Sequence, residues 1–149
     1  MTAPSLRQRM TSMDASFLYF ERPEAPLHIG STTVVEGELS REALVGHMAS
    51  RLHRIPRYRQ IASFDRLNIG HPLWEEDPNF DPMRHVIETR LPQPARHDDL
   101  MKAIAAIMAP MLPRDRPLWK MALIHGLPDG STGVVSLVHH CMVDGVSGV

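Results

Sequence analysis

The chain has 149 residues and a formal net charge of −1, with 43% hydrophobic and 22% charged residues. These values are typical of one globular domain with a real hydrophobic core, and the near-neutral charge gives no reason to expect nucleic acid as a partner. The single cysteine, Cys141, excludes an intramolecular disulfide. No apolar run approaches the ~20 residues that span a bilayer and no signal peptide is visible, so we expect a cytoplasmic protein.

The first half of the chain predicts strands and helices that proline and glycine separate. Ser12 can cap a short helical turn, and Ser40 is a favourable N-cap for a helix over residues 41–54, which Pro56 ends. β-Branched side chains favour the first strand. The strands expected in this half are 29–36, 61–64 and 73–74.

The next stretch predicts one more strand and one more helix. Residues 83–91 alternate between apolar and polar side chains, as a strand with one wet face does. Asp98 or Asp99 can cap a helix that runs to about Ala109 with methionine, leucine and isoleucine on its apolar side. Pro110 ends this helix.

The last stretch predicts an antiparallel hairpin. Two strongly apolar strands, 118–124 and 133–139, flank the turn sequence 127–130, which reads Leu-Pro-Asp-Gly. With the earlier elements, this predicts an α/β (α+β) domain in which helices flank a mixed sheet.

His139 and His140 follow the second strand of this hairpin, and Asp144-Gly145 comes shortly after them. Neighbouring side chains on a strand point to opposite faces, so one histidine should work as a base and the other should pack as a support. A neutral imidazole accepts a proton near neutral pH. Asp144 could buttress the loop, and Gly145 permits a tight turn. Strand parity alone does not decide which histidine faces the pocket.

Other chemistries are disfavoured by the residue pattern. A metal site of His139, His140 and Cys141 would need side chains that diverge along the chain. Ser147 lies in a sequence like a nucleophile elbow, but Val149 stands where that motif has glycine. A Cys141 nucleophile lacks a visible orienting partner. Two adjacent histidines alone are more often structural than catalytic, whereas the full spacing His-His-x-x-x-Asp-Gly after a buried strand favours catalysis.

This spacing, from His139 to Gly145, resembles the HHxxxDG motif of acyltransferases with a chloramphenicol-acetyltransferase-like fold. Residues 13–18 (MDASFL), followed by Glu21 and by residues 26–30 (PLHIG), resemble the opening of bacterial wax ester synthase/diacylglycerol acyltransferases. The sequence Pro117-Leu118-Trp119 is similar to the PLW motif of that family. The three features in this order cover essentially the whole chain.

The resemblance implies an O-acyltransferase that transfers a long-chain acyl group from acyl-CoA to a diacylglycerol or a fatty alcohol, without a cofactor or metal. It implies that His140 is the general base, that His139 and Asp144 hold the loop, and that Gly145 permits its turn. The resemblance further implies that the PLW motif, Pro117-Leu118-Trp119, supports the hairpin and the surface that faces a second domain. The resemblance also fits a protein that lies peripherally at a membrane or at lipid inclusions.

The same family has two similar domains with the active site between them. We therefore expect residues 1–149 to form the N-terminal acyltransferase domain and to need a complementary C-terminal domain, in the same chain or as a separate one. Two alternatives stay open: a non-catalytic fragment that acts as a lipid-binding or assembly module, and an amide-forming enzyme of the condensation-domain type. The MDASFL and PLW stretches speak against the second alternative.

Overall fold

A computed structural model describes residues 7–65, 67 and 69–143 of the chain. Its helices are α1 (Ser12–Phe20), α2 (Arg41–Ala49) and α3 (His97–Met108), with short 3-10 turns η1 (Leu52–Arg54), η2 (Pro56–Arg59), η3 (Pro82–His85) and η4 (His140–Met142). Its strands are β1 (Gln8–Arg9), β2 (His28–Val35), β3 (Gln60–Ser63), β4 (Leu73–Glu76), β5 (Val86–Arg90), β6 (Trp119–His125) and β7 (Thr132–His139).

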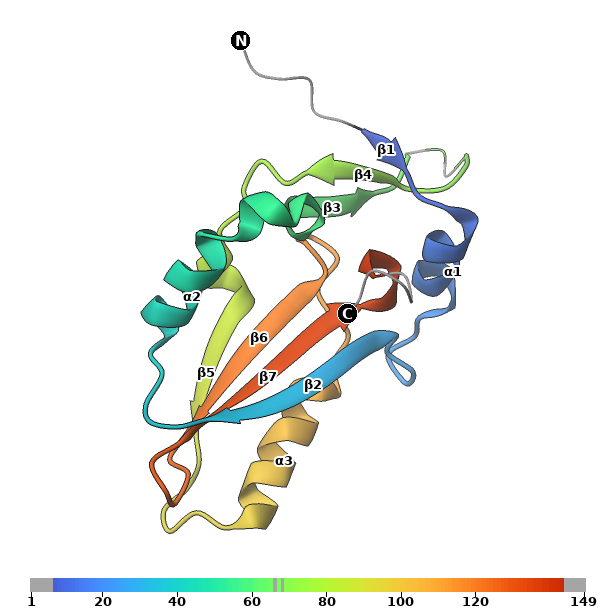
Figure 1. The fold of residues 1–149 in the computed structure, drawn as a ribbon. Coiled ribbons are helices and arrows are strands. Elements are labelled where there is room, and N and C mark those ends of the chain that lie inside the picture. Colours follow the sequence, from blue (N-terminus) through green and yellow to red (C-terminus); the bar gives the residue numbers. More distant parts are fainter. Residues whose placement is uncertain (1–6, 66, 68, 144–149) are drawn as a thin grey trace.

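The strands form two sheets (Figure 1). The larger sheet has the order β2-β7-β6-β5, in which β2, β7 and β6 are antiparallel and β5 runs parallel to β6. The expectation of a mixed sheet flanked by helices is therefore confirmed. The smaller sheet, β1-β4-β3, was not expected from the sequence, because its strands are short and β1 pairs with residues far along the chain.

Helices cover opposite faces of the larger sheet. On one face, Met108 at the end of α3 approaches Gly30 of β2, and its carbonyl lies 2.7 Å from Nε2 of His28. On the other face, Leu44 and Val45 of α2 pack on a cluster formed by Val86, Leu123 and Val134. Among the described residues α2 lies toward the β5 side of this face (Figure 1) and reaches β7 at Val134.

The hairpin between β6 and β7 was predicted correctly. Gly130 takes a positive φ of 76°, which glycine adopts at little cost, and its N–H donates to the carbonyl of Leu127 over 3.0 Å. The carboxylate of Asp129 accepts the N–H of Ser131 and tightens the turn. This turn fixes the register that carries the chain from Trp119 back to Val138.

Three helix boundaries differ from the prediction. Thr11, not Ser12, caps α1, since its hydroxyl accepts the N–H of Asp14. Residue Arg96 takes the N-cap position of α3, and Asp99 instead accepts the Arg96 N–H from inside the first turn. The expected helix over 41–54 ends at Ala49, and the chain continues as the 3-10 turns η1 and η2, the second of which begins at Pro56.

Candidate membrane spans were sought among these helices. Within the described ranges, none of them combines the length and the apolar content that a bilayer crossing requires.

The packing of α2 on the sheet can be tested at Leu123, which is fully buried. We expect Leu123→Ala to lower the free energy of unfolding by about 2–5 kcal/mol, because it removes apolar contacts and leaves a cavity. Ile87 on neighbouring β5 is exposed, so Ile87→Ala should change stability by no more than about 0.5 kcal/mol. Urea unfolding measures both, and equal losses in the two variants would contradict this arrangement of the core.

Candidate active site

The end of β7 delivers the two adjacent histidines to different surroundings. The N–H of His139 donates to the carbonyl of Leu118 over 2.9 Å, and His139 lies opposite His28 across the β2–β7 pair. The strand ends at His139, and His140 begins the 3-10 turn η4. As strand parity predicts, the two side chains therefore do not enter one common environment.

His139 is fully buried, and both of its ring nitrogens face polar groups. Its Nδ1 accepts the backbone N–H of Cys141 over 3.1 Å. Its Nε2 lies 3.3 Å from Oε1 of Glu21, close enough for electrostatic attraction although the geometry is not that of a hydrogen bond. Because Nδ1 acts as an acceptor, the neutral ring must carry its proton on Nε2, and that proton faces the Glu21 carboxylate.

Glu21 ends helix α1 and turns its carboxylate into the interior, where the side chain is 1% exposed. Oε1 accepts the N–H of Leu27 over 3.1 Å. Oε2 accepts from the guanidinium of Arg114 over 3.0 Å, and the same guanidinium nitrogen donates to the carbonyl of Leu18. The buried carboxylate thus has the hydrogen bonds that a charge needs away from water.

These contacts set the protonation states of the pair. Burial by itself would raise the pKa of the Glu21 carboxyl, but the Leu27 N–H, Arg114 and His139 outweigh it, and the pKa is lowered. Burial lowers the pKa of His139 in spite of the opposing Glu21 charge. At neutral pH the pair therefore consists of an ionised Glu21 and a neutral His139.

His140 is only half-buried and keeps access to the outside of the domain. Its ring stacks on Phe17 of α1, with the centroids 4.9 Å apart and the planes at 17°. Its backbone N–H donates to the carbonyl of Leu27 over 3.0 Å. His139 is thus locked in the interior, while His140 stays partly exposed.

The Pro117-Leu118-Trp119 stretch is buried next to this site. Besides the bond from His139 to Leu118, the Trp119 indole N–H donates to the carbonyl of Tyr58 over 2.8 Å. The carbonyl of Trp119 is 2.9 Å from Nδ1 of His85, whose ring also stacks on the indole at 4.2 Å between centroids. These contacts join β6 to η2 and η3 beneath the histidines.

Cys141 lies in the apolar interior. Burial, together with the negative charges of Asp14 and Glu21, raises the pKa of its thiol to about 12. A thiol with so high a pKa holds almost no thiolate at neutral pH, so it is a poor nucleophile. Its backbone N–H, not its sulfur, serves the site.

Two predicted site residues, Asp144 and Gly145, lie outside the described residues, as does Ser147. Among the residues that are described, the support for His139 comes instead from Glu21 and Arg114, which the sequence reasoning did not place in the site. No spacing rule could have found them, because both reach the end of β7 from distant parts of the chain. Glu21 was visible only as part of the MDASFL resemblance.

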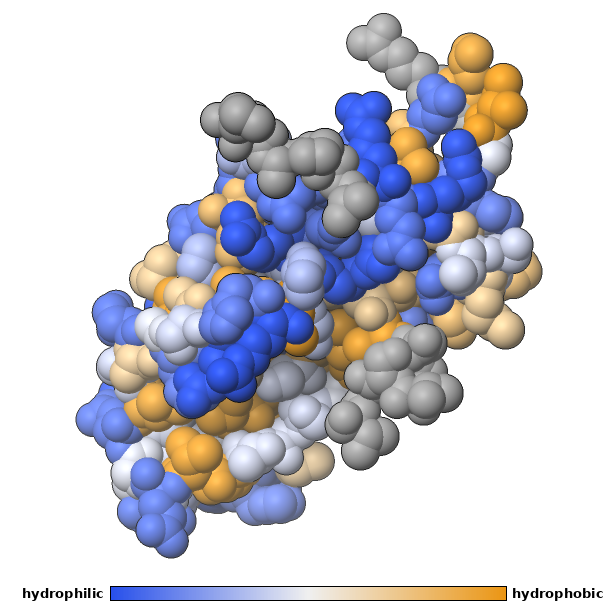
Figure 2. All heavy atoms as spheres, turned by 45° about the horizontal axis from the view of Figure 1, so that its top comes forward, coloured by the Kyte–Doolittle hydropathy of each residue, from blue (hydrophilic) through white to orange (hydrophobic). Residues whose placement is uncertain are grey.

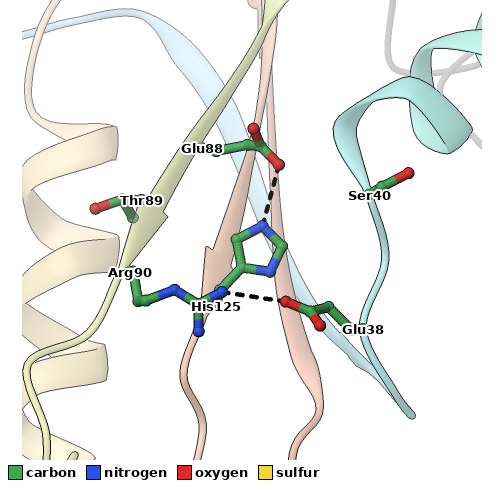
Figure 3. Close-up of a pocket in the computed structure, with 6 residues that line it drawn as sticks. All are labelled: Glu38, Ser40, Glu88, Thr89, Arg90 and His125. Carbon is green, nitrogen blue, oxygen red and sulfur yellow. Dashed lines mark hydrogen bonds and ion pairs between the residues drawn. The ribbon is translucent and has the colours of Figure 1, made fainter.

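A second polar cluster lies at the other end of β6 (Figure 3). Nε2 of His125 is 3.2 Å from Oε1 of Glu88, and Arg90 pairs with Glu38 at 3.1 Å beside a hollow of about 390 Å³. Since β6 has seven residues, His125 lies roughly 20 Å from Trp119 at ~3.4 Å per residue. The cluster therefore does not belong to the histidine site. Nowhere in the described ranges do three or more His, Cys, Asp or Glu side chains form a group that could hold a metal ion.

Solved structures share this fold. A wax ester synthase/diacylglycerol acyltransferase from Marinobacter aquaeolei VT8 superposes with a TM-score of 0.73 at 30% sequence identity, over 94% of this chain and 36% of that one. The starter condensation domain of rhizomide synthetase RzmA superposes with a TM-score of 0.71 at 17% identity, over 95% of this chain and 34% of that one, which is a likeness of fold alone. The chloramphenicol-acetyltransferase-like fold expected from the sequence is thereby confirmed.

The sequence comparisons identify the family. Residues 10–149 match the model of the wax ester synthase/diacylglycerol acyltransferase catalytic domain, and the chain belongs to this family of acyltransferases. It is 38% identical over 141 residues to the "Probable diacyglycerol O-acyltransferase tgs1" of Mycobacterium tuberculosis (strain ATCC 25618 / H37Rv), covering 93% of this chain and 30% of that protein. It is 34% identical over 142 residues to the "Probable diacyglycerol O-acyltransferase tgs3" of the same strain, covering 93% of this chain and 52% of that protein. The chain thus spans about a third to a half of the length of these relatives.

The neutral state of His139 predicts a pH dependence of stability. The folded pKa is lowered, so between about pH 6.5 and the folded pKa the unfolded chain binds the proton first, and stability falls as the pH falls. Glu21, whose folded pKa is also lowered, acts in the same direction at lower pH. The stability difference between the protein and His139→Gln, measured by urea unfolding, should therefore shrink as the pH falls below about 6.5.

His53 is exposed and provides the matched control, because His53→Gln removes a histidine that is not buried and should change the free energy of unfolding by no more than about 0.5 kcal/mol. A His139→Gln difference that stays constant or grows toward acid pH would show that His139 is not held neutral.

Proposed function

We propose that this chain forms the base-bearing part of an acyl-CoA-dependent O-acyltransferase that acylates a diacylglycerol or a fatty alcohol. The observation that carries the proposal is the presentation of His140: a reachable imidazole, stacked on Phe17, directly follows a neighbour that is locked in the interior. Membership of the acyltransferase family supports the reaction class. Because such alcohols are held in membranes and lipid inclusions, the enzyme would work peripherally at the surface of one of these.

In this proposal neutral His140 removes the proton from the hydroxyl of the lipid alcohol. The oxygen attacks the thioester carbonyl of acyl-CoA and forms the ester bond, and the carbon–sulfur bond breaks. The histidinium returns the proton to the leaving thiolate, so that the ester and free CoA are the products. No acyl-enzyme is needed, which agrees with a buried Cys141 whose thiol stays protonated.

The other predicted residues take supporting roles. His139 would fix the end of β7 through Glu21 and Cys141, and Asp144 and Gly145 would shape the loop beyond it. Leu118 and Trp119, with Pro117, would hold the hairpin in place from below. These groups would not react themselves. They would raise the reaction rate by holding His140 in the orientation that the proton transfer needs.

The described residues contact His140 from α1 and from the segment before β2. We infer that residues 1–149 are the N-terminal domain of a two-domain enzyme and that a complementary C-terminal domain supplies the remaining wall of the proposed site. The coverage of only 30% of tgs1 and 36% of the Marinobacter enzyme supports this inference. The binding of acyl-CoA and of the acceptor would then need both domains.

The test is ester formation by the full-length protein, with long-chain acyl-CoA and either a fatty alcohol or a diacylglycerol. Loss of the general base in His140→Ala should lower kcat/KM by about 10²–10⁴-fold. His53→Ala, which removes an exposed histidine, should leave the rate unchanged. Full activity of His140→Ala would contradict the catalytic assignment, and absence of ester formation by the unmodified protein with every pair would contradict the proposed function.

A further inference from the structure

The loop between β3 and β4 carries apolar side chains on the surface of the molecule. Leu67 is 75% exposed and Ile69 is 69% exposed, and Phe64 at the start of the loop is 40% exposed. Exposed loops usually carry polar or small residues, and exposed apolar side chains that lie near one another mark a contact surface. Figure 2 shows hydrophobic atoms projecting from the end of the molecule at which Figure 1 places this loop.

Tyr19 of α1 extends this apolar surface to a second element. Its hydroxyl lies 3.3 Å from Nδ1 of His71, at the β4 end of the loop, and the two ring centroids are 6.1 Å apart. Tyr19 is about half exposed, and an aromatic ring with a polar tip is typical of side chains at the boundary between water and hydrocarbon. Leu67, Ile69 and Tyr19 together are called the β3–β4 tip below.

A guanidinium lies directly against the same loop. Nη1 of Arg9 donates to the carbonyl of His71 over 2.9 Å. Gly70 permits this approach, because it takes a positive φ of 95° and because a Cβ at its position would lie 2.7 Å from Nη1. Within the described ranges no carboxylate forms an ion pair with Arg9. A positive charge without a carboxylate partner therefore lies beside the apolar tip.

Further basic residues lie at this end of the domain. Residues 43–64 contain four arginines and no aspartate or glutamate. The turns η1 and η2 belong to this stretch and lie beside β3 (Figure 1). Over the longer range 43–76, five arginines stand against three acidic residues, although the whole chain has a net charge of −1. Figure 2 shows a broad hydrophilic band next to the projecting hydrophobic atoms.

This combination fits the surface of a phospholipid layer. Aliphatic side chains on a projecting loop can enter the boundary between head groups and hydrocarbon, where burial removes them from water. Arginine side chains at the same depth keep their charge with the phosphates, and an excess of basic residues is attracted to anionic lipids. Nucleic acid would offer phosphates but no hydrocarbon for the two aliphatic side chains.

We propose that the β3–β4 tip docks the protein on an anionic phospholipid surface. Leu67 and Ile69 enter the boundary between head groups and hydrocarbon, Tyr19 lies at the rim of the contact, and Arg9 meets the lipid phosphates. The inference adds to the proposed function the surface that meets the lipid. It does not depend on the chemistry at His140, so vesicle binding tests it without any ester formation.

The experiment measures flotation of the full-length protein with vesicles of phosphatidylcholine mixed with phosphatidylglycerol. The double variant Leu67→Ser/Ile69→Ser should lower the partition coefficient by about tenfold or more, because two aliphatic side chains no longer gain from leaving water. Met101→Ser is the matched control. Met101 is an exposed apolar residue of α3, which lies at the other end of the molecule (Figure 1), so this variant should float as the unmodified protein does.

Two flotation results would overturn the inference: equal flotation of the double variant and the unmodified protein, and failure of the unmodified protein to float. Urea unfolding of the same full-length variants distinguishes lipid from polypeptide as the occupant of the tip. The double variant and Met101→Ser should both leave the free energy of unfolding almost unchanged, because all three side chains are exposed. A loss of stability in the double variant alone would show that another part of the protein covers the tip, and would also overturn the inference.

Arg9 tests the contribution of charge. Arg9→Gln should weaken binding to the mixed vesicles about fivefold, the effect of one cationic side chain near an anionic surface. Arg9→Lys keeps the charge and should retain the binding. Added salt should weaken the binding of the unmodified protein to the mixed vesicles, because it screens the attraction. Equal losses in Arg9→Gln and Arg9→Lys would show that Arg9 supports the loop and does not meet the lipid.

Binding and catalysis are measured separately, so the two proposals can fail independently. Vesicle binding that depends on the β3–β4 tip, without ester formation, would sink only the proposed function. Ester formation from detergent-dispersed substrates, by a protein that does not bind vesicles, would sink only the docking surface.

Discussion

The arrangement at the end of β7 depends on one buried carboxylate. Glu21 accepts hydrogen bonds from Leu27 and Arg114 and faces the imidazole of His139, so it joins the end of α1, the segment before β2, and the last residue of β7. A buried carboxylate is tolerated only when hydrogen bonds and opposite charges compensate for its lost hydration. Removing one of these partners leaves the buried charge incompletely compensated and destabilises the fold. Because His139 and Arg114 are distant from Glu21 in sequence, this pairing holds the end of β7 against the segment that carries Phe17 and Leu27, which contact the ring and the backbone of His140.

The two histidines show how surroundings divide one residue type into two roles. His139 has no solvent contact and a lowered pKa, its Nδ1 accepts the Cys141 N–H, and its Nε2 faces the buried Glu21 carboxylate, so its ring does not meet the surface. His140 takes its position from a ring stack and a backbone hydrogen bond, and within the described ranges its imidazole nitrogens make no hydrogen bond. Support and proposed base thus follow one another at the end of a single strand.

Much of the fold could be predicted because its signals are local. A β-branched run marked β2, an apolar run marked β7, Ser40 marked the start of α2, and the Pro-Asp-Gly turn marked the hairpin. The cap of α3 was misplaced because Asp99 bonds back to the Arg96 N–H from inside the helix. The small sheet and the parallel pairing of β5 with β6 depend on contacts across the chain, which no local pattern encodes. For the same reason the sequence identified the histidines but not the partners Glu21 and Arg114.

The state of His139 is measured most directly by the ¹⁵N chemical shifts of its ring nitrogens. The geometry predicts a neutral ring at neutral pH, with the proton on Nε2 and with Nδ1 as the acceptor from Cys141. It also predicts that this state persists as the pH falls below about 6.5, where an exposed histidine has begun to take up a proton. A ring that is charged at neutral pH, or that carries its proton on Nδ1, would contradict the locking of His139 on which the presentation of His140 rests.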